Sequence, residues 1–199
     1  MVKISIGTPV KEEDIRGLKI NDNVYLTGTM ITARDMAHKR ALQYLSDGMA
    51  LPVSFEDLVV YHCGPVVEKN DEWRVLAAGP TTSMRMESME SDFIRGFKPR
   101  MIVGKGGMGE KTAEALKELP GVYCVFTGGA AVLAAIAVKK VKDVAWLDLG
   151  SAEALWVLEV KEFGPLTVSI DSHGNNLHEE LAGQVNGRRA EVYKALGLK

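Results

Sequence analysis

Cysteine is scarce in this sequence. Only Cys63 and Cys124 occur, each in a different predicted strand and without a partner at metal-ligand spacing. A structural zinc site or an iron–sulfur cluster takes three or four such ligands, so neither can be a property of this chain alone. We expect two buried free thiols.

Excess charge and long apolar runs are also lacking. The formal net charge is -2, and no group of lysines and arginines is dense enough to follow a phosphate backbone. No apolar run approaches the ~20 residues that span a membrane, and the first residues lack a signal-peptide pattern. The sequence therefore argues against nucleic-acid and membrane partners. We expect a cytoplasmic protein whose ligand, if charged, is small.

The hydrophobic content suffices for one complete core. The 199 residues are 46% hydrophobic, which predicts a single domain over residues 1–199. Strand-like apolar segments alternate with segments of helical period, which predicts an α/β fold with a mostly parallel sheet and flanking antiparallel strands. Strands are expected at residues 24–30, 57–62, 73–78, 100–103, 122–126, 144–149 and 156–170, the last broken at 163–165. Helices are expected at residues 32–46, from 81, at 110–118, at 130–138 and from 176.

Polar side chains follow several of these strands. Thr81 and Thr82 follow the strand at 73–78 after the turn Gly79-Pro80, and Arg85 lies one helical turn beyond Thr81. Arg34 and Lys105 occupy two other strand-to-helix turns. In parallel sheets such turns meet at the carboxyl edge, where ligands bind. Cations around a pair of hydroxyls suit a small polyanion, and arginine pairs well with carboxylates.

Plainer interpretations remain open for these residues. Thr81 and Thr82 are ordinary helix N-caps, and Thr32 has the spacing of a capping box. The strands at 57–62 and 73–78 are expected to form an antiparallel hairpin. His62, at the end of the first of them, would face the same edge, although a structural role for it is at least as well supported. We expect His38 to be peripheral because it lies beside two basic residues.

Two further motifs are weak. Gly104, Gly106 and Gly109 spell a dinucleotide fingerprint, but the next strand ends without the acidic residue that would hold a ribose. His173 and His178 flank a Gly-Asn-Asn run, which indicates a turn with asparagine caps rather than a metal pair.

Several long motifs resemble the beta subunit of the iron–sulfur class I fumarase and L-tartrate dehydratase family. They are GTMITARDMAHKR (28–40), GPTTSMRME (79–87), VGKGGMG (103–109), GGAAVLA (128–134) and EFGPL (162–166). The resemblance extends from about residue 8 to 176 and implies a swivelling β/β/α domain, equivalent to the C-terminal domain of single-chain members. It also implies an alpha subunit, in an α2β2 assembly, whose three cysteines hold a [4Fe-4S] cluster.

The resemblance also implies roles for residues of this chain. Thr81 matches the family's proposed catalytic base, and Arg34, Arg85 and Lys105 match the side chains that grip the carboxylates of a small dicarboxylate substrate. It thus implies a hydro-lyase, with fumarate hydratase as the main hypothesis and L(+)-tartrate dehydratase as the alternative. The Gly-Lys-Gly-Gly run, which other members vary, is closer to the two-subunit enzymes and leaves that choice open. A non-catalytic anion-binding or assembly subunit is the rival from another class.

Overall fold

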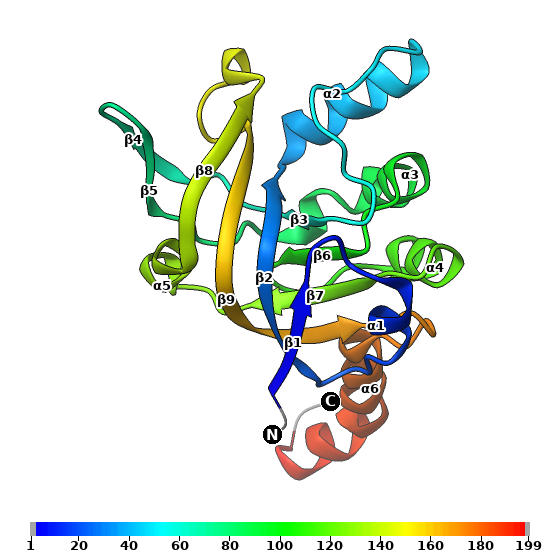
Figure 1. The fold of residues 1–199 in the computed structure, drawn as a ribbon. Coiled ribbons are helices and arrows are strands. Elements are labelled where there is room, and N and C mark those ends of the chain that lie inside the picture. Colours follow the sequence, from blue (N-terminus) through cyan, green and yellow to red (C-terminus); the bar gives the residue numbers. More distant parts are fainter. Residues whose placement is uncertain (1–2, 198–199) are drawn as a thin grey trace.

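The fold is built around a closed β-barrel. The computed structural model describes residues 3–197. Strands β2, β3, β6 and β7 run parallel, and β9 lies antiparallel to both β7 and β2, so it closes the sheet on itself (Figure 1). The strand bounds are β1 Lys3–Gly7, β2 Asn23–Thr32, β3 Val59–Tyr61, β4 Val66–Lys69, β5 Trp73–Ala77, β6 Met101–Gly104, β7 Val122–Phe126, β8 Val138–Ala145 and β9 Leu155–Ile170. The predicted α/β class with a mostly parallel sheet and separate antiparallel strands is confirmed, whereas the closure was not predicted.

Alternation along the barrel strands separates two cores. Successive side chains of a strand point to opposite faces, so Val59 and Tyr61 enter one buried cluster while Val60 enters the other. The first cluster lies inside the barrel and includes Trp156 and Phe163. The second lies between the barrel and the helices that cover it. Burial of a large apolar side chain in these clusters contributes about 1.5–3 kcal/mol to the stability of the folded chain.

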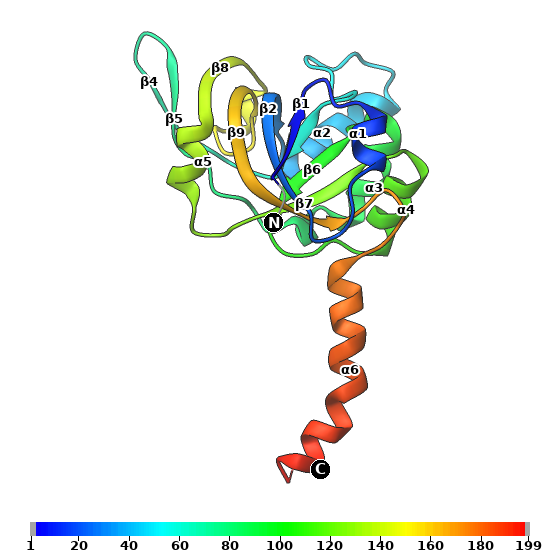
Figure 2. The same cartoon turned by 60° about the horizontal axis from the view of Figure 1, so that its bottom comes forward.

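Three helices cover one side of the barrel. They are α2 Asp35–Ser46, α3 Glu87–Phe97 and α4 Glu110–Glu118, which lie side by side in Figure 1. Smaller helices are α1 Glu12–Arg16 and α5 Ala131–Ala137, and α6 Leu177–Ala195 extends away from the barrel (Figure 2). The Asn176 side chain accepts a bond from the His178 amide at the start of α6, which confirms the predicted asparagine cap. Within residues 3–197, no helix combines the length and apolarity needed to cross a bilayer.

The long strand β9 is continuous, contrary to the predicted break at 163–165. It bends through register shifts against both β2 and β7, which allow one strand to close both edges. Gly164 has φ 158°, and a Cβ there would stand 2.7 Å from the Val24 carbonyl oxygen. Only glycine allows this close approach of two backbones.

Several predicted boundaries were wrong. The hairpin partner of β5 is β4, because the strand at 57–62 joins the parallel barrel as β3. Thr32 is the last residue of β2, and its hydroxyl bonds to backbone groups of Ala154 and Trp156 instead of capping α2. The segment predicted as a strand at 144–149 belongs to the end of β8 and a following 3-10 turn.

The alanine-rich helix α5 is only partly buried. Only Ala134 is buried, while Val132, Leu133 and Ile136 are 63–67% exposed. Because α5 packs beside the β4–β5 hairpin at the margin of the barrel, it has just one covered face (Figure 1).

Candidate active site

An irregular segment at residues 80–83 lies against the ends of strands β3 and β6. The Thr81 amide donates to the His62 carbonyl (2.6 Å), and the Ser83 amide donates to the Lys105 carbonyl (3.0 Å). Isolated bridges pair Cys63 with Pro80 and Thr82 with Lys105. Thr81 and Lys105 are therefore held at one edge of the barrel. For Thr81 the predicted reason was wrong, because β5 lies outside the barrel and these backbone bonds bring the residue to the edge.

Arg34 reaches the same edge from the end of β2. It is the N-cap residue of α2, its side chain is 20% exposed, and its Nε lies 3.3 Å from Glu153 Oε1. Glu153 also accepts a bond from the Met36 amide, which fixes this carboxylate beside α2. A Cβ on Gly64 would stand only 2.6 Å from Arg34 Nη1, so the missing side chain of Gly64 makes room for the guanidinium.

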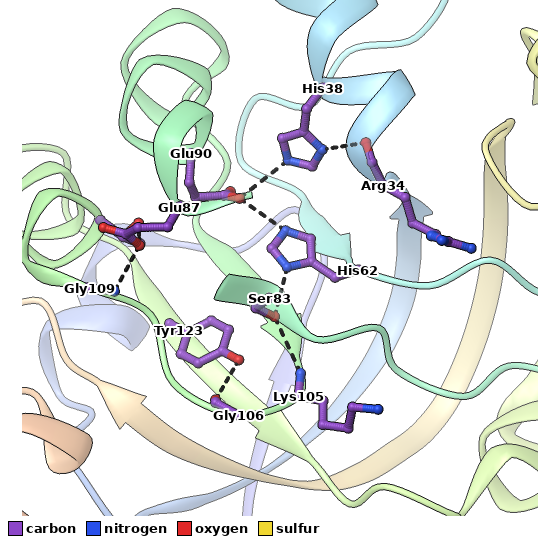
Figure 3. A network of polar contacts seen from close by, with 11 residues as sticks. Arg34, His38, His62, Ser83, Glu87, Glu90, Lys105, Gly106, Gly109 and Tyr123 are labelled. Atoms are coloured by element: carbon purple, nitrogen blue, oxygen red, sulfur yellow. Dashed lines mark hydrogen bonds and ion pairs between the residues drawn. The ribbon is translucent and has the colours of Figure 1, made fainter. Parts of the chain in front are cut away.

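Lys105 presents an uncompensated charge. Its side chain lies against Gly128, and within residues 3–197 its ammonium has neither an ion pair nor a hydrogen bond. The Tyr123 hydroxyl donates to the Gly106 carbonyl (2.8 Å) and so anchors the loop just after the lysine. In Figure 3 the side chains of Lys105 and Arg34 extend to the same side.

Arg85 lies close to these residues but is already paired. Its Nη2 and Nε lie 2.8 and 3.1 Å from the two carboxylate oxygens of Asp35, the residue after Arg34. Such a two-point contact is the geometry in which arginine binds carboxylates. The structure therefore brings Arg85 to the edge predicted from the sequence, but its guanidinium is occupied by Asp35.

The helix predicted to begin at Thr81 begins at Glu87. A 3-10 turn, Ser83–Arg85, precedes it, and the Thr82 side chain caps neither element. Thr81 is half-buried and lies outside the first turn of α3, so it does not face the free amides of that helix. The cations nearby remain the feature that favours a negative charge here.

His38 is fully buried, and its predicted peripheral position was wrong. Its Nε2 lies 3.3 Å from Glu90 Oε2, and His62 Nε2 lies 3.1 Å from the same oxygen (Figure 3). Burial alone would raise the pKa of Glu90, but the two imidazoles outweigh it and hold that pKa well below its usual range. Burial opposes charge on His38, yet Glu90 and the bond to the Arg34 carbonyl raise its pKa above 6.5. Glu90 and His38 therefore form a buried ion pair.

Comparison with known proteins decides the family of the chain. The model of the family described as "Fumarase C-terminus" matches residues 1–181. The chain belongs to the fumarase C-terminus family.

Relatives agree with this assignment. Over 180 residues the chain is 45% identical to the L(+)-tartrate dehydratase subunit beta of Escherichia coli (strain K12), covering 90% of this chain and 88% of that protein. It is 43% identical to the putative L(+)-tartrate dehydratase subunit beta of Methanocaldococcus jannaschii, covering 91% and 94%. It is also 46% identical to the putative fumarate hydratase class I of Geobacillus stearothermophilus, covering 89% of this chain and 34% of that protein.

Neither cysteine of this fumarase C-terminus chain is suited to bind a metal cluster. Cys63 and Cys124 are both buried, as predicted, and both thiols are free. Burial raises the pKa of the Cys63 thiol to about 12, although Arg34 and Tyr61 act in the opposite direction. Burial likewise raises the pKa of Cys124. Buried thiols that stay protonated make poor metal ligands, because the thiolate is the form that binds.

Three residues that contact the predicted site were missed by sequence reasoning. Glu153 contacts Arg34, Glu90 joins the two histidines, and the Ser83 hydroxyl lies 2.9 Å from His62 Nδ1. Ser83 lies within the GPTTSMRME motif, so its presence there was the available signal. Glu153 comes from a distant segment. Glu90 lies just after that motif, but no spacing in the sequence connects it to His38 or His62.

Proposed function

We propose that this chain is the beta subunit of a hydro-lyase that removes water from a 2-hydroxy dicarboxylic acid. The observation that carries the proposal is the convergence of Arg34, Lys105 and Thr81 at one edge of the barrel. Family membership and the names of the relatives support the same activity. The reaction is either (S)-malate to fumarate, the main hypothesis, or L(+)-tartrate to oxaloacetate, and relatives of similar identity carry both names.

Recognition of the two carboxylates falls to the cations. Lys105 offers an unpaired ammonium and Arg34 a guanidinium that Glu153 only partly occupies. Arg85 can join them by exchanging the Asp35 carboxylate for a substrate carboxylate, since the two are chemically equivalent ligands. Negative charge accumulates on the carboxylate next to the carbon that loses a proton, and fixed cations stabilise it there.

Thr81 is assigned to proton removal at that carbon. A free hydroxyl is a poor base at neutral pH, so the neighbouring cations must favour its ionised form. Hydroxide leaves from the adjacent carbon, and the described cations at this edge are already assigned to the substrate carboxylates. That part of the reaction therefore falls to the partner subunit.

The resemblance to iron–sulfur enzymes is consistent with such a division. The two buried thiols of this chain do not fit a [4Fe-4S] cluster, so in this proposal the alpha subunit holds it and supplies a Lewis acid. We assign the chain, as a single swivelling β/β/α domain over residues 1–199, to an α2β2 assembly. The words "subunit beta" in the relatives' names support the existence of a partner.

The proposal is tested with the reconstituted complex. The chain is co-expressed with its alpha subunit without oxygen, and dehydration of malate and of L(+)-tartrate is followed. Lys105→Ala should lower kcat/KM at least ~10²-fold, whereas Lys111→Ala, an exposed lysine of α4, should leave it unchanged. A cluster-loaded complex without activity on either acid would refute the proposal and favour a non-catalytic anion-binding or assembly subunit.

A further inference from the structure

A continuous line of polar contacts joins the backbones of Arg34 and Lys105 beneath the proposed active site. His38 Nδ1 lies 2.9 Å from the Arg34 carbonyl, and the Lys105 amide lies 3.3 Å from the Ser83 hydroxyl. The side chains between these two ends, here called the buried network, are His38, Glu90, His62 and Ser83. Figure 3 shows the whole line.

We propose that the buried network positions Arg34 and Lys105 for the two carboxylates of the substrate, with His38 as an imidazolium and His62 neutral. The inference rests on the proposed function, because it assigns the network a purpose in that same site. Its members are positioning residues, since all four are buried beneath the site.

The two ends of the line determine where its protons lie. The Arg34 carbonyl can only accept a hydrogen bond, so His38 Nδ1 must carry a proton. The Lys105 amide can only donate, so the Ser83 oxygen accepts from it. In this proposal the Ser83 hydroxyl donates its own proton to His62 Nδ1 (2.9 Å). The reverse direction would place a proton on both nitrogens of His62 and so add a second buried positive charge beside a single carboxylate.

The middle of the line follows from these ends. Both Nε2 atoms face one oxygen of Glu90, and a carboxylate only accepts, so each Nε2 carries a proton. His38 is then protonated at both nitrogens and His62 at Nε2 alone. One cation and one carboxylate leave the buried network with no net charge, which is the condition for keeping ionised groups away from water.

The surrounding packing keeps this arrangement in place. A Cβ on Gly104 would lie 1.8 Å from the Ser83 oxygen and 3.2 Å from His62 Nδ1, so a side chain there would displace both groups. The Phe93 ring lies 4.3 Å from the His38 ring, centroid to centroid. Because all four members are fully buried, their geometry is transmitted to the two backbone ends and not lost to solvent.

A metal ion is the other occupant that such a cluster suggests. One ligand atom from each of His38, His62 and Glu90 lies within 4.8 Å of the others. Three ligands fall short of the four in a structural zinc site, and the apolar Phe93 stands beside them with no exposed surface for entry. Protons on the two Nε2 atoms satisfy the Glu90 carboxylate without any further ligand, and this favours the proposal over a metal site.

A double-mutant cycle tests whether Ser83 acts through Lys105. In the reconstituted complex, Ser83→Ala should lower kcat/KM about five- to tenfold, the effect expected for one lost hydrogen bond. In a Lys105→Ala background the same change should have no further effect, because the side chain that it positions is gone. Equal losses in both backgrounds would overturn the proposal.

Substitutions of Glu90 separate geometry from general stability. Glu90→Gln keeps the shape, and its amide oxygen can still accept from His62 Nε2, but it removes the negative charge beside His38. We therefore expect kcat/KM to fall about three- to tenfold, whereas Glu90→Ala should lower it at least ~30-fold. Glu87→Gln is the matched control one turn earlier in α3, where the carboxylate binds the Gly109 amide and the Thr112 hydroxyl instead. It should lower the melting temperature without changing KM. Equal losses for both Glu90 variants would contradict positioning by the network.

The proton arrangement is tested apart from activity. Nitrogen NMR of the full chain labelled at histidine should show, at pH 7, His38 protonated at both nitrogens and His62 only at Nε2, with His38→Gln and His62→Gln variants assigning the signals. Two neutral rings, or stoichiometric metal in the purified chain, would overturn the inference. This readout stands even if neither malate nor tartrate is a substrate, so failure of the network and failure of the proposed function are distinguishable.

Discussion

Gly64→Ala is the sharpest test of how the fold positions Arg34. A methyl group at this position would stand 2.6 Å from Arg34 Nη1, 2.6 Å from the Ala152 carbonyl oxygen and 3.0 Å from the Ala152 Cβ. Movement of the guanidinium relieves only the first contact. The other two involve the backbone and the short side chain of Ala152, so the segment around it must shift as well.

The expected magnitude follows from these contacts. Overpacking of this kind costs about 1–3 kcal/mol of folding stability. A displacement of about 1 Å in a group that holds the substrate can cost ~10²-fold in rate. We therefore expect kcat/KM of the reconstituted complex to fall by one to two orders of magnitude, together with a lower melting temperature.

Two measurements separate these effects. Thermal unfolding of the variant gives the stability loss, and initial rates over a range of substrate concentrations give KM and kcat. Gly183→Ala serves as the control, because Gly183 lies in α6 with nothing within 4 Å of its added Cβ, and alanine there should stabilise the helix by about 0.5–1 kcal/mol. Unchanged kcat/KM in Gly64→Ala, with an intact fold, would refute the view that Gly64 sets the position of Arg34.

Three further predictions concern the same edge of the barrel. Thr81→Ala should reduce kcat at least ~10²-fold if Thr81 removes the proton, and a variant complex with near-normal turnover would exclude that role. Asp35→Asn should free Arg85 and lower KM about two- to fivefold, while stability changes by no more than about 1 kcal/mol because Arg85 is half exposed; an unchanged KM would count against Arg85 as a substrate ligand. Because the pKa of His38 is raised in the folded chain, its stabilising effect is complete below pH 6.5 and is lost as pH rises through the folded pKa. Urea unfolding at increasing pH should show this loss in the wild type but not in His38→Gln, and parallel curves would refute the assignment.

Local patterns in the sequence predicted much of the fold correctly. The helix at 110–118 and the strand at 122–126 have the predicted bounds, because each is a regular segment between glycine or proline residues. The closure of the barrel could not be predicted from local patterns, since it depends on β9 pairing with β2 more than a hundred residues away. The bend that permits it requires register shifts, which leave no periodic signal.

The site was predicted only where strand ends determine it. Arg34 and Lys105 follow the barrel strands β2 and β6, so topology places them at one edge. Thr81 follows β5, which lies outside the barrel, and reaches this edge through its amide bond to the His62 carbonyl. His38 was assigned to the surface because of its basic neighbours, but the helix turns it, with Ala37 and Ala41, toward α3. Its carboxylate partner comes from another helix, and one sequence offers no means of pairing the two.

Gly104 belongs to a glycine motif that is typical of dinucleotide binding but has another role in this structure. It opens a Gly-x-Gly-x-x-Gly run, which is typical of dinucleotide-binding turns. In the structure its missing side chain leaves room for the Ser83 hydroxyl and the His62 ring. The close approach that glycine permits here serves the protein's own side chains.

Several basic residues of this protein are already paired with carboxylates. Arg40 forms a two-point ion pair with Asp148, and Lys3 pairs with Glu162. A cation that is already neutralised gives little to an arriving anion, because the existing pair must be broken first. Lys105 has no such partner within residues 3–197, and it is held from its backbone side by Ser83. A contact to the backbone of Lys105 holds the residue in place without neutralising its ammonium. The buried network can therefore position this cation while its full charge remains available to a ligand.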